Sequence, residues 1–148
     1  MKLKYILLPI LSLLLLGTLY AQNSSETFNE KLLIGNWEYE KLIDENNVEV
    51  TTIPRMGTFG WESAVVTGPD LRFSENNSCL KFTPNIGDLH CSWNLKTPNI
   101  IYYSELRNEK DEVVRDPISQ KIKLLTEKNL ILEYENGMYF VYKKLKKS

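Results

Sequence analysis

The chain has 148 residues, a length that fits a single domain. Its 18 Lys and Arg residues are balanced by 19 Asp and Glu residues, for a formal net charge of −1. Proteins that bind nucleic acid carry strongly basic faces, so this balance argues against that class of function. The one basic cluster, at 143–147, is expected to be a solvated C-terminal tail.

The first 21 residues have the three parts of an export signal. Lys2 and Lys4 give the positive start, Ile6–Leu16 gives the apolar run, and Ala21 is a small residue before the expected cut. A membrane-spanning helix needs about 20 apolar residues, so this shorter run predicts a cleaved signal and no stable membrane anchor. The mature chain is expected to be residues 22–148, one domain in the periplasm or outside the cell.

The elements predicted after the signal are a short helix and many short strands. Thr27 and Glu30 fit a capping box that starts the helix, and Gly35 is a natural stop for it. Eight to ten short strands at regular spacing then favour an all-β fold, either a small antiparallel up-and-down β-barrel or a sandwich. The expected strands are Trp37–Ile43, Val48–Ile53, Ser63–Thr67, Asp70–Phe73, Ser78–Thr83, Leu89–Leu95, Ile100–Leu106, Ile118–Leu125, Leu130–Glu135 and Met138–Leu145.

Gly35 and Trp37 mark the passage from the helix into the first strand. Glycine lacks a Cβ, so it lets the chain turn sharply at this point. Trp37 is predicted to close one end of the barrel and to be structural rather than ligand-binding.

Cys79 and Cys91 are the only cysteines, and an exported protein permits a disulfide between them. They flank a predicted hairpin. A hairpin centred on Asn85 places the two cysteines opposite each other, within bridging distance. A register that pairs Phe82 with Leu89 buries apolar side chains better but turns Cys79 to the other face, because a slip of one residue exchanges the faces. Both registers remain open from the sequence.

The last two strands meet at Asn136-Gly137, the strongest two-residue turn signal. A two-residue turn pairs Tyr134 with Tyr139 and places Lys143 on the inner face opposite Leu130. From there the Lys143 ammonium is expected to lie over the Trp37 indole. The expected inner face carries Ile122, Leu124, Leu130, Leu132, Tyr134, Tyr139 and Val141, and the outer face carries Ile131, Glu133, Glu135, Met138, Phe140 and Tyr142.

No pattern of residues indicates catalysis or a metal. His90 is the only histidine, and no Gly-x-Ser-x-Gly segment accompanies it. Gly57 and Gly60 are not followed by a predicted helix, so they do not indicate a phosphate loop. Two cysteines and one histidine do not give the four-ligand spacing of zinc. The sequence therefore predicts neither an enzyme nor a cofactor nor a metal site.

Arg55–Trp61 is expected to be a long loop, and long aromatic loops are where barrel proteins place lids or binding edges. Phe59 and Trp61 would form an apolar wall at the barrel mouth opposite Trp37, and Arg55 would meet a carboxylate. The alternative is that the two rings plug the mouth or pack on a neighbouring strand. The expected ligand-binding residues are Arg55, Phe59, Trp61, Tyr134 and Tyr139.

Five segments together resemble the lipocalin-like small exported proteins of bacteria. They follow the order of that family's first strand, strand-into-turn segment, mid-chain Trp strand and closing hairpin, over most of residues 32–145. The resemblance implies a barrel of about eight strands. In classical lipocalins a late Arg lies beside the first-strand Trp, and Lys143 or Lys144 stands in that place here. The segments are 33–39, 71–77, 91–95, 124–132 and 139–144.

Two classes of function fit this barrel. The first is a non-enzymatic, monomeric lipocalin-like protein that binds a small apolar or amphipathic molecule inside the barrel. The second is a periplasmic or secreted interaction or structural module, with a barrel filled by its own side chains and a partner surface that includes Phe140 and Tyr142. Barrels of this size occur in both forms, so the fold alone does not decide between them.

Overall fold

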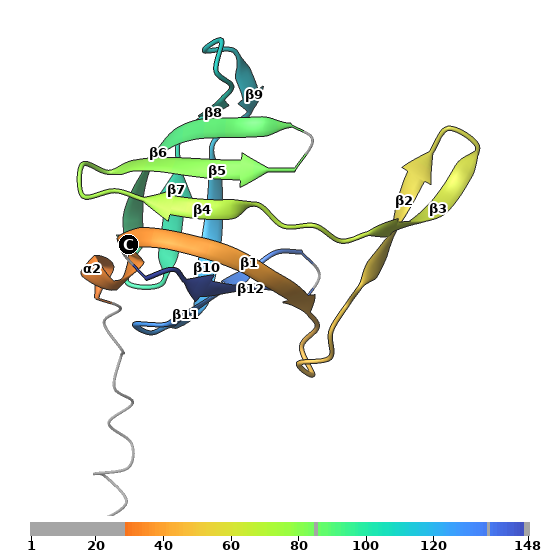
Figure 1. Ribbon diagram of the computed structural model, residues 1–148, viewed down its shortest axis with the longest axis horizontal. Helices are drawn as coiled ribbons and strands as arrows, with labels where there is room; N and C mark the ends of the chain where they lie inside the picture. Colours follow the sequence, from red (N-terminus) through yellow and green to blue (C-terminus); the bar gives the residue numbers. More distant parts are fainter. Residues whose placement is uncertain (1–28, 85, 136, 147–148) are drawn as a thin grey trace, which may run out of the picture.

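The computed structural model describes residues 29–84, 86–135 and 137–146. The predicted signal, Met1–Ala21, and the predicted capping residue Thr27 lie outside these described residues. The described part is a closed eight-stranded antiparallel barrel with one very short helix at one end and a two-stranded arm that extends away from the barrel (Figure 1). The predicted all-β barrel is therefore confirmed.

The barrel is a meander in which each strand pairs antiparallel with its neighbours. The order around it is β4, β1, β12, β11, β10, β7, β6 and β5, and the pairing of β5 with β6 closes the ring. Three strands, β4, β5 and β10, have the bounds that the sequence predicted. The bounds are β1 (Gly35–Ile43), β4 (Asp70–Phe73), β5 (Ser78–Thr83), β6 (Gly87–Thr97), β7 (Ile100–Tyr103), β10 (Ile118–Leu125), β11 (Asn129–Glu133) and β12 (Tyr139–Lys144).

Two further short strands extend the barrel wall beside β6. They are β8 (Leu106–Arg107) and β9 (Val113–Arg115), joined through a charged turn at 108–111. β8 pairs with β6 through Arg107 and His90, and Leu106 pairs with Arg115 of β9. β9 was not predicted from the sequence because its three residues are all exposed and show no alternation of buried and exposed positions.

The expected long loop at Arg55–Trp61 is instead a β-hairpin, which we call the arm. Its strands are β2 (Thr52–Gly57) and β3 (Gly60–Val65), and they pair with each other only, in a sheet of their own. Gly57 pairs with Gly60, and Gly60 takes a φ of 118°, so the glycines belong to a tight turn and not to a loop.

The end of the barrel at the start of β1 is closed by the helix α2 (Glu30–Leu33). Asn29 caps the helix by accepting a hydrogen bond from the Lys31 amide, so the cap lies two residues after the predicted one. Trp37 is fully buried, and its Nε1 donates to the Leu33 carbonyl oxygen at 2.7 Å. Gly35 takes a φ of 135°, a backbone conformation that other residues rarely adopt. The chain thus turns from α2 into β1 at Gly35, and the Trp37 side chain is bonded to the end of the helix.

The closing hairpin differs from the prediction by one residue of register. The Tyr134 amide donates to the Met138 carbonyl at 2.8 Å, and Gly137 has a φ of 76°, so the connection is one residue longer than a two-residue turn. Leu132 therefore pairs with Phe140, and a slip of one residue exchanges the faces. Phe140 and Tyr142 lie inside the barrel, whereas the prediction placed them outside.

A β-bulge in β10 changes which leucine points into the barrel. The register shifts between Ile122 and Leu124, so Leu125 takes the buried position and Leu124 is 38% exposed. The core then includes buried apolar side chains from all eight barrel strands and from the helix. Its members of lowest exposure are Leu33, Trp37, Leu42, Phe73, Ile101, Tyr103, Ile122, Leu130, Leu132 and Tyr142.

Candidate functional site

The hairpin of β5 and β6 turns a lysine into the barrel. Cys79 pairs directly with Cys91 and forms a disulfide with it, so of the two registers left open from the sequence the structure has the one that places the cysteines opposite each other. Lys81 then lies on the same face as Cys79, because side chains alternate along a strand. Phe82, which the competing register would have buried, is 50% exposed.

Lys81 is the only charged side chain among the buried described residues, at 7% exposure. Its Nζ lies 3.7 Å from the centroid of the Tyr103 ring, across the barrel interior. The ion pairs of the described residues do not include Lys81, so no carboxylate neutralises it. Burial, and after it the nearby positive charge of Arg115, lowers the pKa of Lys81 to about 7.

Two buried hydrogen-bonding groups of the barrel interior lack a partner within the described part of the chain. They are the Tyr103 hydroxyl and Trp93 Nε1, both buried. Tyr103 and Trp93 are paired directly across β7 and β6, and Phe73 contacts both rings, at 6.2 and 5.2 Å between centroids. Burial raises the pKa of the Tyr103 phenol, so the hydroxyl remains protonated and able to donate. Such groups usually have a protein or solvent partner, so their lack of one needs an explanation.

More tyrosine hydroxyls belong to the same interior. Burial raises the pKa of Tyr142, and the nearby groups Tyr103, Tyr39 and Asp70 raise it further. The Tyr39 and Tyr142 rings are in edge contact, with centroids 6.2 Å apart. The interior therefore combines aromatic walls with phenol, indole and ammonium groups, which could bind the polar end of a small molecule.

The arm carries three of the predicted ligand-binding residues away from the barrel. Phe59 is fully exposed at its turn, and Trp61 is 74% exposed. Arg55 forms an ion pair with Glu62 of the facing strand at 2.8 Å. Their expected position at the mouth of the barrel is wrong, because the two glycines make a tight turn that continues the hairpin outwards (Figure 1).

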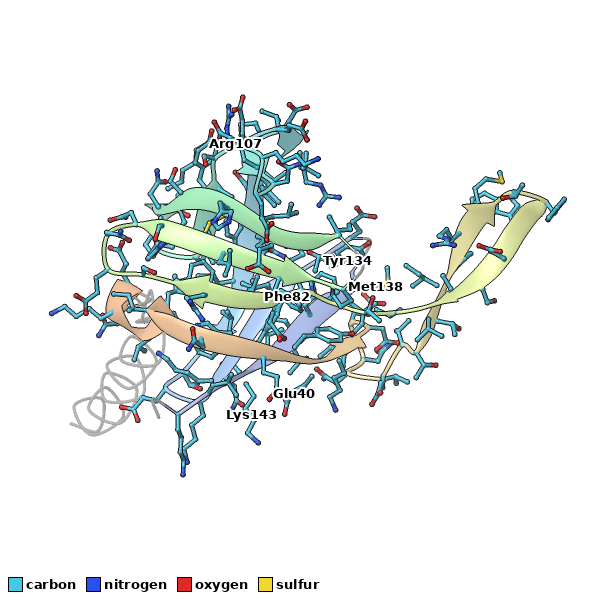
Figure 2. The ribbon with its side chains drawn as sticks, turned by 45° about the horizontal axis from the view of Figure 1, so that its top comes forward. Glu40, Phe82, Arg107, Tyr134, Met138 and Lys143 are labelled. Carbon is cyan, nitrogen blue, oxygen red and sulfur yellow. A yellow bond between two sulfur atoms is a disulfide. The ribbon has the colours of Figure 1, made fainter. Side chains whose placement is uncertain are left out.

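The two predicted tyrosines do not face each other. Tyr134 packs on the buried Phe140, with ring centroids 4.5 Å apart, beside Met138 near the base of the arm (Figure 2). Tyr139 turns the other way, and Lys123 Nζ lies 3.7 Å from its ring centroid. The structure therefore keeps Tyr134 at the edge of the core and removes Tyr139 from the expected site.

The lysine over Trp37 is Lys144 and not Lys143. Lys144 Nζ lies 4.9 Å from the centroid of the Trp37 ring and donates to the Leu32 carbonyl at 2.6 Å. Lys143 is exposed on the outside of the barrel (Figure 2), and it lies opposite Glu38 in the pairing of β12 with β1. The predicted contact is correct in kind but wrong by one residue, for the same reason that the hairpin faces are exchanged.

Two surface hollows lie outside the barrel. The larger, of about 810 Å³, borders β6, β7 and β8 and includes Arg107, which Glu105 and Asp111 hold at 2.7 and 3.5 Å. The smaller, of about 320 Å³, lies over β1, β4 and β5 and includes Asp70 and Arg72. The strongest charge in the larger hollow is already neutralised, so the interior around Lys81 is the better candidate site.

Lys81 was not identified from the sequence because burial of apolar side chains favoured the other register. The cysteine spacing contained the missing signal, since a bridge between Cys79 and Cys91 places Lys81 on their face. Within the described ranges, no group of three His, Cys, Asp or Glu side chains could hold a metal ion. None of the helices in the same ranges is long and apolar enough to cross a membrane.

Comparisons with known proteins give structural neighbours only. No protein-family model matches the chain, and no curated protein matches it. A lipocalin-like protein from Bacteroides uniformis is 17% identical, with a TM-score of 0.49 over 77% of this chain and 99% of that chain. An uncharacterized protein from Bacteroides eggerthii is 17% identical, with a TM-score of 0.48 over 76% and 99% of the two chains.

Proposed function

We propose that this protein is an exported, non-enzymatic barrel that binds a small amphipathic molecule in its interior. The observation that carries the proposal is the pair of buried, unpartnered groups on Tyr103 and Trp93, found within the described residues. Most buried polar groups in proteins have hydrogen-bond partners, and a bound ligand would supply them here. A barrel with a purely structural interior would gain more from apolar residues at these positions.

The apolar part of such a ligand has suitable neighbours. Tyr39, Tyr134 and Met138 are partly buried and pack against the core. Tyr134 and Met138 lie side by side where the closing hairpin turns, near the base of the arm and away from α2 (Figures 1 and 2). Ligand sites in proteins are mostly apolar, with a few polar groups that orient the ligand. The interior and this edge provide both kinds of surface.

The test is to measure the binding of a series of fatty acids and fatty alcohols by titration calorimetry. Native mass spectrometry of protein purified from its own cells tests separately for a ligand that co-purifies. Tyr103→Phe removes the unpartnered hydroxyl, and Tyr102→Phe is the matched control because Tyr102 contacts Lys96, an exposed residue. We expect Tyr103→Phe to change the affinity for these fatty acids and alcohols and Tyr102→Phe to leave that affinity unchanged. If no member of the series binds and no ligand co-purifies, the proposal is wrong.

The arm favours a second candidate function, an interaction module. Because Met56 pairs with Trp61, these side chains share one face of the arm, and Val65 lies on the same face. They are 62%, 74% and 76% exposed, while the Arg55–Glu62 ion pair occupies the opposite face. Exposed apolar patches of this kind mark interaction sites, and an isolated two-stranded hairpin is only marginally stable in water.

A photo-crosslinking amino acid placed at Phe59 in living cells tests this second candidate. A reproducible adduct with one protein, absent when the same amino acid replaces exposed Lys143, would support the interaction module. If the two positions give the same background, the arm is not a docking element.

A further inference from the structure

We propose that Lys81 and Tyr103 form a subsite inside the barrel for the carboxylate head group of the ligand. This inference rests on the proposed function and adds the chemical class of the ligand to it. The two side chains come from β5 and β7 and meet with the Lys81 ammonium 3.7 Å from the centre of the Tyr103 ring.

Lys81 has no countercharge among the described residues. Lys81 is 7% exposed, and the described residues provide it with a ring face but with no carboxylate. A buried charge is stable only when it is paired and hydrogen-bonded. An anionic ligand would supply the pairing that the chain does not.

The Tyr103 hydroxyl is a second hydrogen-bond donor available to the ligand. The Tyr103 hydroxyl is buried, has no partner among the described residues, and is kept protonated because burial raises its pKa. A carboxylate has two acceptor oxygens, so it can accept from an ammonium and a phenol together. Hydrogen bonds of this charge-assisted kind are stronger than those between neutral groups.

The one charge found to act on Lys81 among the described residues is positive: it is that of the exposed Arg115 on β9. Beyond the pair, the phenol of Tyr142 on β12 is close enough to Tyr103 to interact with it, and the Asp70 carboxylate acts on Tyr142 but on neither Lys81 nor Tyr103. The positive charge beside Lys81 favours an anion as its partner.

The experiment compares decanoate with decan-1-ol, two ligands with the same chain length, by titration calorimetry on the full mature protein. We expect Lys81→Met to weaken decanoate binding by about 30-fold or more, since truncating one partner of a buried, hydrogen-bonded charge pair has effects of this size. Decan-1-ol binding is expected to change little. The matched control is Lys96→Met, because Lys96 lies 4.6 Å over the neighbouring Tyr102 ring but is exposed.

The outcomes separate the two proposals. If both ligands bind and Lys81→Met affects them equally, the subsite is wrong while ligand binding stands. If neither ligand binds the wild-type protein, both proposals fail.

A second measurement keeps the inference testable should Lys81→Met not fold. The titration of Lys81 is followed by NMR of the wild-type protein, with and without decanoate. A bound carboxylate favours the charged amine, so the pKa of Lys81 is expected to rise on binding. Saturation with decanoate without any change in that pKa would overturn the subsite.

Discussion

Cys79 and Cys91 face each other across β5 and β6 with Cα atoms 5.0 Å apart, and this disulfide fixes which face of β5 points inwards. Lys81, two residues further along β5, is buried as a result, and Phe82 is left at the surface. Covalent geometry thus outweighs the burial of a phenylalanine in setting the register. The candidate site depends directly on this pairing.

Reduction of the disulfide is expected to destabilise the protein by about 2–4 kcal/mol, the usual contribution of a bridge closing a short loop. The bridged residues are 12 positions apart in the sequence. Urea unfolding with and without reductant measures the loss, and Cys79→Ser/Cys91→Ser serves as a variant that reductant cannot change. Equal unfolding midpoints for the oxidised and reduced wild-type protein would contradict the prediction.

Trp37→Ala is expected to destabilise the fold by about 3–5 kcal/mol, the range for removing a large buried aromatic side chain. Trp37 is fully buried, and its replacement by Ala also removes the hydrogen bond to the Leu33 carbonyl. Trp61→Ala is the control, because Trp61 is 74% exposed and its loss should change stability by no more than about 0.5 kcal/mol. Similar losses for both variants would mean that Trp37 does not close the barrel.

Lys144→Ala is expected to be destabilising by about 1 kcal/mol, because the ammonium lies over the Trp37 ring and bonds to a backbone carbonyl. Lys143→Ala should have little effect, since that side chain is exposed. Thermal unfolding of the two variants side by side decides the matter. A larger effect at Lys143 would restore the register predicted from the two-residue turn.

The stability of the protein is expected to rise with pH between about 7 and about 10. The pKa of Lys81 is lowered to about 7 in the folded state, so over this range the unfolded chain binds more protons than the folded one. Below about pH 7 both states are protonated and the full penalty of the buried charge applies; each unit of pKa shift corresponds to about 1.4 kcal/mol.

The measurement is the difference in unfolding free energy between the wild type and Lys81→Met across this range. The difference isolates Lys81 from the tyrosines, whose raised pKa values stabilise the fold at lower pH and lose that effect as pH rises above about 10. A difference that does not vary with pH would show that Lys81 titrates normally.

Strands with clear alternation were predictable from sequence. Asp70–Phe73 and Ser78–Thr83 have the predicted bounds because turn residues flank them and buried residues alternate along them. The arm was not predictable, since Gly57 and Gly60 mark a loop or a tight turn equally well and nothing in the barrel covers Trp61.

The site was less predictable than the fold because it depends on register. The closing turn has one residue more than predicted, so Phe140 and not Tyr139 lies on the inner face. The disulfide places Lys81 and not Phe82 on the inner face of β5. Residue patterns give the alternation of a strand but not which of its two faces points inwards when both carry apolar side chains. The disulfide and the length of the closing turn decide the face, and of these two only the disulfide leaves a signal in the sequence, through the spacing of the cysteines.

The most direct test of the account uses the three indole N–H resonances of the protein, from Trp37, Trp61 and Trp93, in one NMR spectrum with increasing decanoate. Trp93 Nε1 is buried and without a partner among the described residues, while Trp37 is bonded to Leu33 and Trp61 is exposed on the arm. The account predicts a saturable shift of the Trp93 resonance, with Trp37 and Trp61 unchanged. A shift confined to Trp61, or no shift at any indole, would contradict ligand binding inside the barrel.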